Sequence, residues 1–168
     1  KIFDKIYIST DSKKISKVVK NFNCDLLYPR PKYLSNDHAK TLEVVKYEIK
    51  KINENKILNV CCMYPAAPLT SINDIIKGYK ILKKNKDKFI IPSCKPTFDI
   101  DRVYFKKKKY VLKNPKVIDN RSQDLQEYLH DAGQFYWASV KNWIKSKNIF
   151  SDFIPFEINS IRFCDINY

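Results

Sequence analysis

Short apolar segments alternate along the chain with longer segments in which apolar residues recur every three or four positions. The short segments are rich in Ile, Val, Leu and aromatic residues and predict strands at residues 5–10, 25–28, 57–64, 88–94 and 133–139. The longer repeat predicts amphipathic helices around residues 15–22, within 38–53, over 72–82 and around 140–145. Asp11 or Ser12 suits the N-cap of the first helix and Ser71 that of the third, because short polar side chains accept from free helix amides.

This alternation predicts an α/β fold with a doubly wound, mostly parallel sheet. Residues 57–64 (ILNVCCMY) are apolar on both alternating faces, which is typical of a central parallel strand covered by helices on both sides. Ligands of such sheets bind beyond the carboxyl ends of the strands. The loops after Thr10, Tyr64 and Cys94 are therefore the candidate binding positions.

The alternation breaks at residues 95–132, which predict an inserted β-rich lobe within a single domain of 168 residues. The lobe contains a hairpin-like segment, RVYFKKKKYVLK, with four consecutive lysines at 106–109. These lysines are interpreted as the solvated face of the hairpin, and a clamp on an anionic ligand is the alternative. Final strands are predicted at 153–158 and 161–166.

Composition narrows the class of protein. The chain is 44% hydrophobic and 14% aromatic, which is enough for a packed core. No apolar run approaches the ~20 residues of a membrane span, and the first residues resemble a strand rather than a signal peptide, so we expect a cytoplasmic protein. The five cysteines show no CxxC spacing, which argues against a zinc site or a disulfide framework.

The formal charge is +14, from 32 basic and 18 acidic residues, and suggests a polyanionic partner. Only four of the basic residues are Arg, the usual reader of bases and phosphates, which argues against nucleic acid. With two glycines the sequence has no Gly-rich phosphate loop. His38 and His130 each adjoin an aspartate and suit an acid/base couple, although a surface or hinge histidine is the simpler interpretation.

Four segments together carry a resemblance to a known family. They are RPKYLSNDHAKT at 30–41, CCMYPAAPLTSINDI at 61–75, NRSQDLQEYLHDAGQFYW at 120–137 and CDINY at 164–168. In this order they resemble the cytidylyltransferases that activate nine-carbon acidic sugars, and the third segment is closer to the pseudaminic acid branch than to the sialic acid branch. The resemblance spans essentially the whole chain and implies a fold like that of the nucleotide-diphospho-sugar transferases.

The resemblance also implies an activity. Enzymes of this family couple CTP to the anomeric hydroxyl of the sugar acid and release pyrophosphate, giving a CMP-sugar for surface glycan or flagellin glycosylation. It implies Mg²⁺ as the cofactor, held by Asp165 and less well by Asn167, where an amide replaces the second carboxylate of the family motif. Asp165 and Arg30 are the implied catalytic residues. The alternatives are a turn cap for Asp165 and a turn salt bridge for Arg30.

The implied ligand contacts fall into two sets. Arg30, Asp37 and Thr41 would bind the nucleotide, although Asp37 and Thr41 also suit capping of the second helix. The residues implied to contact the sugar are Tyr64, Pro65, Ala66, Arg121, Gln123, Gln134, Phe135 and Tyr136. Tyr64, Pro65 and Ala66 replace the Gln-Pro-Thr of the sialic acid enzymes, and the run at 135–137 is otherwise simply core.

Members of the family begin with a strand and a basic, glycine-containing loop that holds the CTP phosphates, and continue past the metal motif. We therefore expect this chain to be incomplete at both ends and to turn over little by itself. The lobe is expected to make a homodimer contact, from which Arg121 and Gln123 reach the sugar. The alternatives are the same chemistry on sialic or legionaminic acid, and a non-catalytic basic module that binds a polyanion such as nucleic acid.

Overall fold

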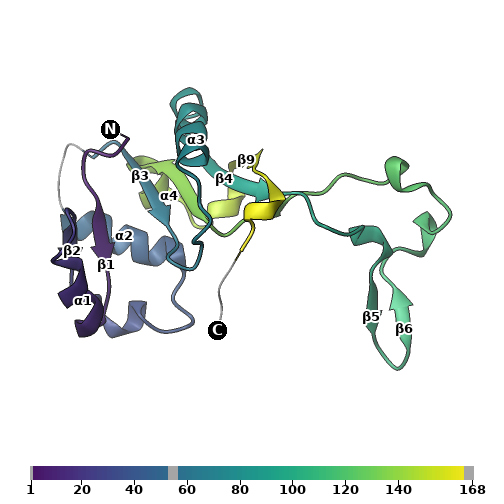
Figure 1. Cartoon of the computed structure of the whole chain (residues 1–168), viewed down its shortest axis with the longest axis horizontal. Helices are drawn as coiled ribbons and strands as arrows, with labels where there is room; N and C mark the ends of the chain where they lie inside the picture. The colour runs from purple at the N-terminus through teal and green to yellow at the C-terminus, as the bar shows by residue number, and fades with distance from the viewer. Residues whose placement is uncertain (1, 53–56, 165–168) are drawn as a thin grey trace.

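The computed structural model describes residues 2–52 and 57–164 (Figure 1). Its centre is a five-stranded mixed sheet. The strands are β3 (Asn59–Met63), β4 (Phe89–Cys94), β7 (His130–Asp131), β8 (Phe135–Ser139) and β9 (Phe153–Glu157). β8 is antiparallel to both β3 and β4, so β3 and β4 point the same way, and β9 runs parallel to β4. β7 continues the line of β8 along the end of β4.

A second, two-stranded sheet comes first in the chain. β1 (Tyr7–Ser9) and β2 (Asp25–Leu27) pair in parallel and are joined by α1 (Lys13–Val19). Ser12 caps α1 by accepting from the Ile15 amide, as the sequence predicts. β1 and β3 both point downward in Figure 1, so the loops after Thr10 and Tyr64 lie toward the same edge of the molecule.

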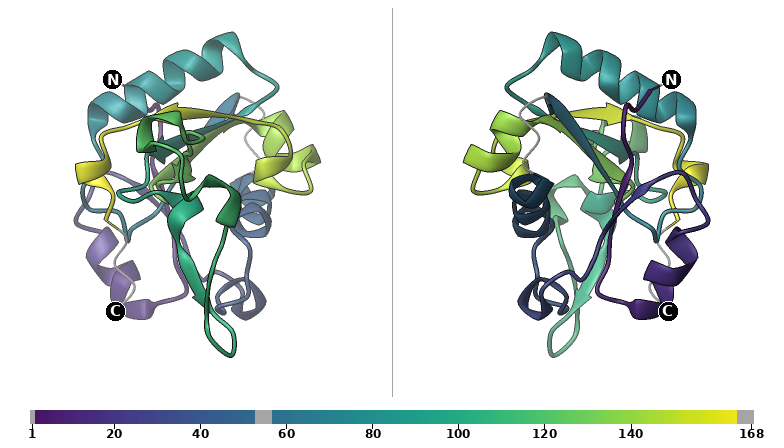
Figure 2. Two further views of the ribbon diagram at one scale, coloured as in Figure 1. Left: turned by 90° about the vertical axis from the view of Figure 1, so that its right-hand side faces the viewer. Right: turned by 90° about the vertical axis from the view of Figure 1, so that its left-hand side faces the viewer.

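One face of the main sheet is covered by α3 (Ile72–Lys84), which Ser71 caps as expected. Figure 2 shows this helix lying across the sheet. Trp137 and Phe135 of β8 and Phe156 of β9 pack on this face. Gly78 permits the close approach of the helix, because a Cβ there would lie 3.0 Å from Cδ1 of Trp137. A side chain at position 78 would push α3 away from the sheet.

The other face is covered by α2 (Thr41–Ile52) and α4 (Val140–Lys145). Trp143 of α4 is fully buried against Phe89, and its indole N–H donates to the carbonyl of Val60 at 3.2 Å. Leu42 and Val45 of α2 complete this apolar cluster. The α/β class that the sequence predicts is therefore confirmed, with helices on both faces of the sheet.

Three local predictions are corrected by the structure. β4, not β3, is the strand buried at all six positions, since in the described chain β3 pairs with β8 alone and antiparallel to it. Residues 161–164 are not a strand, because Ser160–Arg162 form a 3₁₀ turn, η6; residues 165 and 166 lie outside the described residues. The pattern puts Ile15, Val18, Val19 and Phe22 on one helix face; of these Val19 is buried, but about half or more of Ile15, Val18 and Phe22 is exposed.

Within the predicted lobe, residues 95–129 form an arm that projects from the body (Figure 1), whereas His130 and Asp131 pair with β4 and Ala132 lies in the core. Its hairpin, β5 (Tyr104–Lys106) with β6 (Tyr110–Leu112), matches the predicted one, and the four lysines at 106–109 are exposed. Short 3₁₀ turns fill the rest of the arm: η2 (Ile100–Arg102), η3 (Pro115–Val117) and η4 (Ser122–Asp124). None of the helices in the described part of the chain is long and apolar enough to cross a membrane.

Candidate functional site

Four side chains form a continuous row of hydrogen bonds and ring contacts at the carboxyl ends of β3 and β4. The Thr41 hydroxyl bonds to the Tyr64 hydroxyl, the Tyr64 ring packs against the Tyr136 ring, and Tyr136 donates to Oδ2 of Asp131. The two tyrosine rings meet edge to face, with centroids 5.5 Å apart. We call Thr41, Tyr64, Tyr136 and Asp131 the tyrosine row.

Local structure explains why these residues meet. Thr41 begins α2, Tyr64 directly follows β3, and Asp131 and Tyr136 lie on either side of the turn between β7 and β8. Gly133 makes that turn with φ +60°, a conformation that favours glycine, and its amide donates to Oδ1 of Asp131 at 3.0 Å. The Tyr64 amide donates to the carbonyl of Gln134 at 2.9 Å, which fixes the two strand ends together.

The row is fixed at its acidic end. Tyr136 donates its single hydroxyl proton to Asp131, and the Thr41 and Tyr64 hydroxyls bond to each other. Burial raises the pKa of Tyr64, and burial with the hydrogen bond to Asp131 raises that of Tyr136 far above its usual range. Both phenols therefore stay protonated at neutral pH, and Tyr136 remains a donor to Asp131.

A cavity of about 240 Å³ opens beside Asp131. Its walls are Ile91, Ser93, Leu129, Asp131, Phe150, Phe153 and Pro155. The Phe150 ring lies edge to face with that of Tyr136, so cavity and row share a wall. An apolar cavity with one carboxylate and one hydroxyl suits a ligand that presents apolar groups together with a few hydrogen-bond donors.

The predicted sugar contacts lie in three places. Tyr64 and Tyr136 belong to the row, and exposed Pro65 and half-buried Ala66 follow Tyr64 in the adjoining loop. Phe135 is fully buried against Phe156 on the α3 side of the sheet, which is the core environment given as the alternative.

Gln134 is fully buried, and its side-chain amide bonds to the backbone of residue 162 and not to a residue that lines the cavity. Its Nε2 donates to the backbone carbonyl of Arg162 at 2.8 Å. Arg121 and Gln123 are exposed on the arm, where Arg121 pairs with Asp124 at 3.0 Å. Within one chain, the structure therefore does not bring these two arm residues to the row (Figure 1).

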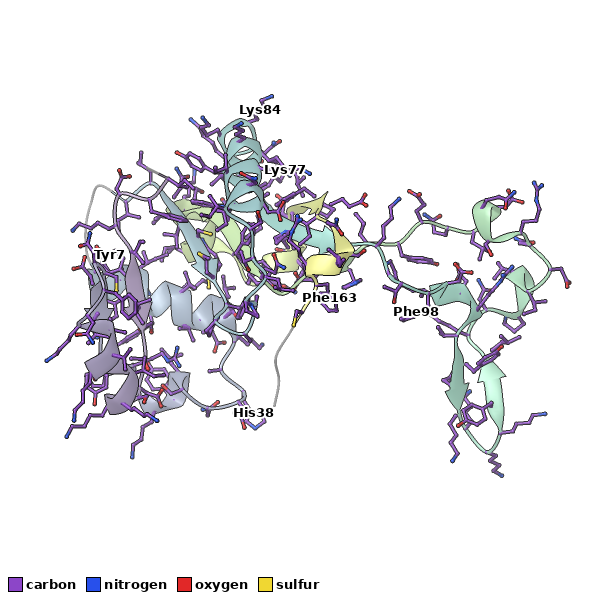
Figure 3. The ribbon with its side chains drawn as sticks, in the orientation of Figure 1. Tyr7, His38, Lys77, Lys84, Phe98 and Phe163 are labelled. Atoms are coloured by element: carbon purple, nitrogen blue, oxygen red, sulfur yellow. The ribbon has the colours of Figure 1, made fainter. Side chains whose placement is uncertain are left out.

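The predicted nucleotide residues surround the carboxyl end of β1 and the start of α2. Arg30 donates from Nε to the Ser35 hydroxyl at 3.1 Å and lies 3.9 Å from Asp11, so it makes the local turn contacts given as its alternative. Its backbone amide donates to Thr10, at the end of β1. Asp37 is exposed, next to His38 at the lower edge of Figure 3.

The predicted metal ligands, Asp165 and Asn167, lie outside the described residues. Among residues 2–52 and 57–164, no group of three or more His, Cys, Asp or Glu side chains is arranged to hold a metal ion. The Mg²⁺ prediction therefore stays a prediction, and it rests on Asp165 and Asn167.

Sequence reasoning missed Asp131 as a ligand candidate and Phe150 as a cavity wall. The signal for Asp131 was present, because it lies next to His130 and two residues before a glycine. The sequence suggests an acid/base couple of His130 with the Asp131 carboxylate, but the structure does not form it. Nδ1 of His130 bonds to the backbone carbonyl of Asp131, and the carboxylate accepts from the Tyr136 hydroxyl. Phe150 gave no signal, since only the fold brings it to Tyr136.

Comparison with known proteins gives the following relatives. Residues 1–159 match the profile of a family described as cytidylyltransferase. A pseudaminic acid cytidylyltransferase of Campylobacter jejuni subsp. jejuni serotype O:23/36 (strain 81-176) is 31% identical over 153 residues, 89% of this chain and 66% of the relative. A Helicobacter pylori (strain ATCC 700392 / 26695) protein named pseudaminic acid cytidylyltransferase and UDP-2,4-diacetamido-2,4,6-trideoxy-beta-L-altropyranose hydrolase is 30% identical over 168 residues, 99% of this chain and 32% of the relative.

Among solved structures, a CMP:2-keto-3-deoxy-manno-octonic acid synthetase complexed with CTP superposes with a TM-score of 0.61. The match covers 92% of this chain and 72% of that chain at 10% identity, so it shows a likeness of fold. The chain spans just under two thirds of the length of the Campylobacter relative and about a third of the Helicobacter one.

Proposed function

The chain belongs to the cytidylyltransferase family, and we propose that it forms most of the catalytic domain of an enzyme that makes a CMP-sugar from CTP and a nine-carbon acidic sugar. The observation that carries the proposal is the tyrosine row. It brings Thr41, which the resemblance assigns to the nucleotide, together with Tyr64 and Tyr136, which it assigns to the sugar, at one edge of the sheet. That edge, at the carboxyl ends of the strands, is where α/β sheets bind their ligands.

The cavity beside Asp131 supports pseudaminic acid as the sugar. The name of the Helicobacter relative includes a sugar with two acetamido groups and a deoxy carbon, and a nine-carbon acid of that chemistry would present methyl groups and N–H donors. Phe150, Phe153 and Leu129 offer apolar walls for the methyl groups, and Asp131 offers an acceptor for an N–H or hydroxyl. Sialic and legionaminic acids are the alternatives that an assay must separate.

In the proposed reaction, the anomeric oxygen of the sugar forms a bond to the α-phosphorus of CTP. The bond from that phosphorus to the bridging oxygen breaks, pyrophosphate leaves, and the hydroxyl proton passes to solvent or a carboxylate. The protein's part is to hold the two reactants in line. Because both phenols stay protonated, the row keeps Asp131 fixed as an acceptor beside the cavity.

The nucleotide is proposed to lie between the loop after β1 and the start of α2. The Arg30 guanidinium is about a quarter exposed there and suits phosphate oxygens, with Thr41 and Asp37 nearby in sequence. When bound, Mg²⁺ would polarise the α-phosphate, with Asp165 and Asn167 as proposed ligands. Because CTP is a cytoplasmic metabolite, we place the reaction in the cytoplasm.

We also propose a homodimer formed through the arm. Phe98, Tyr104 and Tyr110 expose more than 60% of their surface on a projection that has few apolar contacts of its own. Exposed apolar groups on a projecting element mark an interaction surface. In such a dimer, Arg121 and Gln123 would reach the site of the partner.

The proposal is tested by pyrophosphate release from CTP in the presence of pseudaminic, legionaminic or sialic acid. The enzyme should carry the sequence that flanks these residues in its gene, and the 168-residue chain is assayed beside it. We expect turnover with pseudaminic acid first. No release with any of the three sugars would overturn the proposal, and salt-sensitive binding of unrelated DNA in its place would favour the basic-module alternative.

A further inference from the structure

An ion pair with a buried carboxylate ties the last described residues to α3. Asp74, in the first turn of α3, is 7% exposed, and its Oδ2 accepts from Nε of Arg162 at 3.1 Å and from Nη2 at 2.6 Å. About a third of the Arg162 side chain is exposed. Two donors on one oxygen fix the orientation of the guanidinium as well as its distance.

Two contacts from the sheet hold the same segment from the other side. The Gln134 side chain donates to the Arg162 carbonyl at 2.8 Å, and the Phe163 ring meets the His130 ring edge to face at 4.7 Å. Figure 3 shows Phe163 beside the body where the arm leaves it. Residues 160–164 are therefore held both by α3 and by the β7–β8 turn.

This segment lies beside the tyrosine row. His130 and Gln134 flank Asp131 on the same turn, so the contacts that hold Arg162 and Phe163 come from the turn that holds the row's acceptor. Burial raises the pKa of the Cys94 thiol at the end of β4, and the charges of Asp131, Arg162 and Asp74 act on the same thiol.

We infer that Asp74, Arg162 and Gln134 form a positioning clamp that fixes residues 160–164 at the edge of the sheet where the proposed reaction occurs. The inference rests on the proposed function, because Asp165 follows this segment directly in the sequence. It assigns Gln134 a positioning role in place of the sugar contact that the resemblance implied. A shift of about 1 Å at a reacting centre costs up to roughly 100-fold in rate.

The exposed pair of Lys88 with Asp152 provides a matched control. Its Nζ to Oδ1 distance is also 2.6 Å, and it joins the starts of β4 and β9 at the opposite end of those strands, with more than half of the Asp152 side chain exposed. Asp74→Asn removes the charge of a buried carboxylate, and Asp152→Asn makes the same change at an exposed carboxylate. Asp74→Glu keeps the carboxylate and tests rescue.

The first measurement is amide hydrogen exchange of the wild-type chain and of these variants. The Arg162 and Phe163 amides donate within the 160–164 turn, to Asn159 and Ser160, and report directly on its order. We expect Asp74→Asn to speed their exchange by about tenfold or more, with the β4 amides unchanged. Asp152→Asn should leave them as in the wild type, and Asp74→Glu should restore part of the protection.

The second measurement is the steady-state kinetics of the full-length enzyme. Asp74→Asn should lower kcat by about 10- to 100-fold with a smaller change in KM for the sugar, whereas a merely structural pair would change the melting temperature and leave kcat of the folded enzyme unchanged. Unchanged exchange in Asp74→Asn, or faster exchange with unchanged kcat, would overturn the inference. A wild-type enzyme without turnover would refute the proposed function instead, and the exchange result would still decide whether the clamp exists.

Discussion

The body and the arm are organised in opposite ways. In the body, Trp143, Phe135 and Ile90 are fully buried, and the polar row lies at one edge of the sheet. In the arm the buried group is polar: the Asp101 carboxylate is 7% exposed and accepts from the Tyr128 hydroxyl and the Asn114 amide. Three aromatic residues of the arm, Phe98, Tyr104 and Tyr110, are instead more than 60% exposed.

This difference shows what each region can do alone. The body has a core that holds the side chains of the candidate site in place, because close packing restricts their rotamers. The arm is held by a few polar contacts and presents apolar surface, so its aromatic residues become buried only when something covers them. Changes in the body should therefore alter chemistry or stability, and changes on the arm should alter assembly.

The largest effect is expected at Asp131, the end of the row. Asp131→Asn keeps one acceptor oxygen where the carboxylate has two, for Tyr136 and Gly133, and removes the charge that faces the cavity, so kcat/KM for the sugar should fall by about 10- to 100-fold. Pyrophosphate release checks this, with Asp119→Asn on the arm as the control. Equal activity of the two variants would contradict a role for Asp131.

Gly78→Ala tests the packing of the body without touching the site. The new Cβ would lie 3.0 Å from Trp137 and 3.3 Å from Phe135, so the free energy of unfolding should fall by about 1–3 kcal/mol. Denaturant titration measures it, and Lys80→Ala on the exposed face of α3 is the control. An unchanged midpoint would show that α3 can move away from the sheet at little cost.

Tyr136→Phe removes one hydroxyl from the middle of the row and keeps the ring in the core. Asp131 loses a buried donor, so the free energy of unfolding should fall by about 1–2 kcal/mol. The matched change on the arm, Tyr104→Phe, should alter nothing, since that side chain is 68% exposed. Equal unfolding midpoints for the two variants would argue that the row adds no stability.

Alkaline pH should lower the free energy of unfolding of the body, because a buried thiol must keep its proton in the folded state. Burial raises the pKa of Cys62 from 9.0 to about 12, so the folded state keeps a proton that the unfolded state loses above pH 9. Stability is full below pH 9 and falls as pH rises toward 12, by at most about 1.4 kcal/mol per pH unit for one group. Guanidinium unfolding at several pH values measures the slope, and Cys62→Ala should make it shallower. A slope that Cys62→Ala leaves unchanged would assign the loss to other groups.

The smallest effect on stability is expected on the arm. The double variant Tyr104→Ser with Tyr110→Ser should shift the free energy of unfolding by no more than about 0.5 kcal/mol, because both rings are exposed in the single chain. It should, however, weaken the proposed dimer, which light scattering over a concentration series would show. A monomeric wild type would overturn the dimer proposal.

Much of the fold was predictable because it depends on local patterns. Ser71 and the repeat from Ile75 to Leu82 specify α3 and its buried face, and residues 88–94 form the predicted strand. The order and direction of strands were not predictable, since β8 enters between β3 and β4 from more than 40 residues away in sequence. For the same reason, Phe150 and Asp74 gave no sign of their roles.

The sequence by itself determined the family, the alternation of strands and helices, the position of the arm and three members of the row, because those depend on residue types and their spacing. Only the tertiary structure decided that Asp131 ends the row, that Gln134 holds Arg162, and that Arg121 and Gln123 lie away from the site of their own chain. The physical reason is that hydrogen bonds and packing between distant segments are set by strand register and helix placement, which local sequence does not specify.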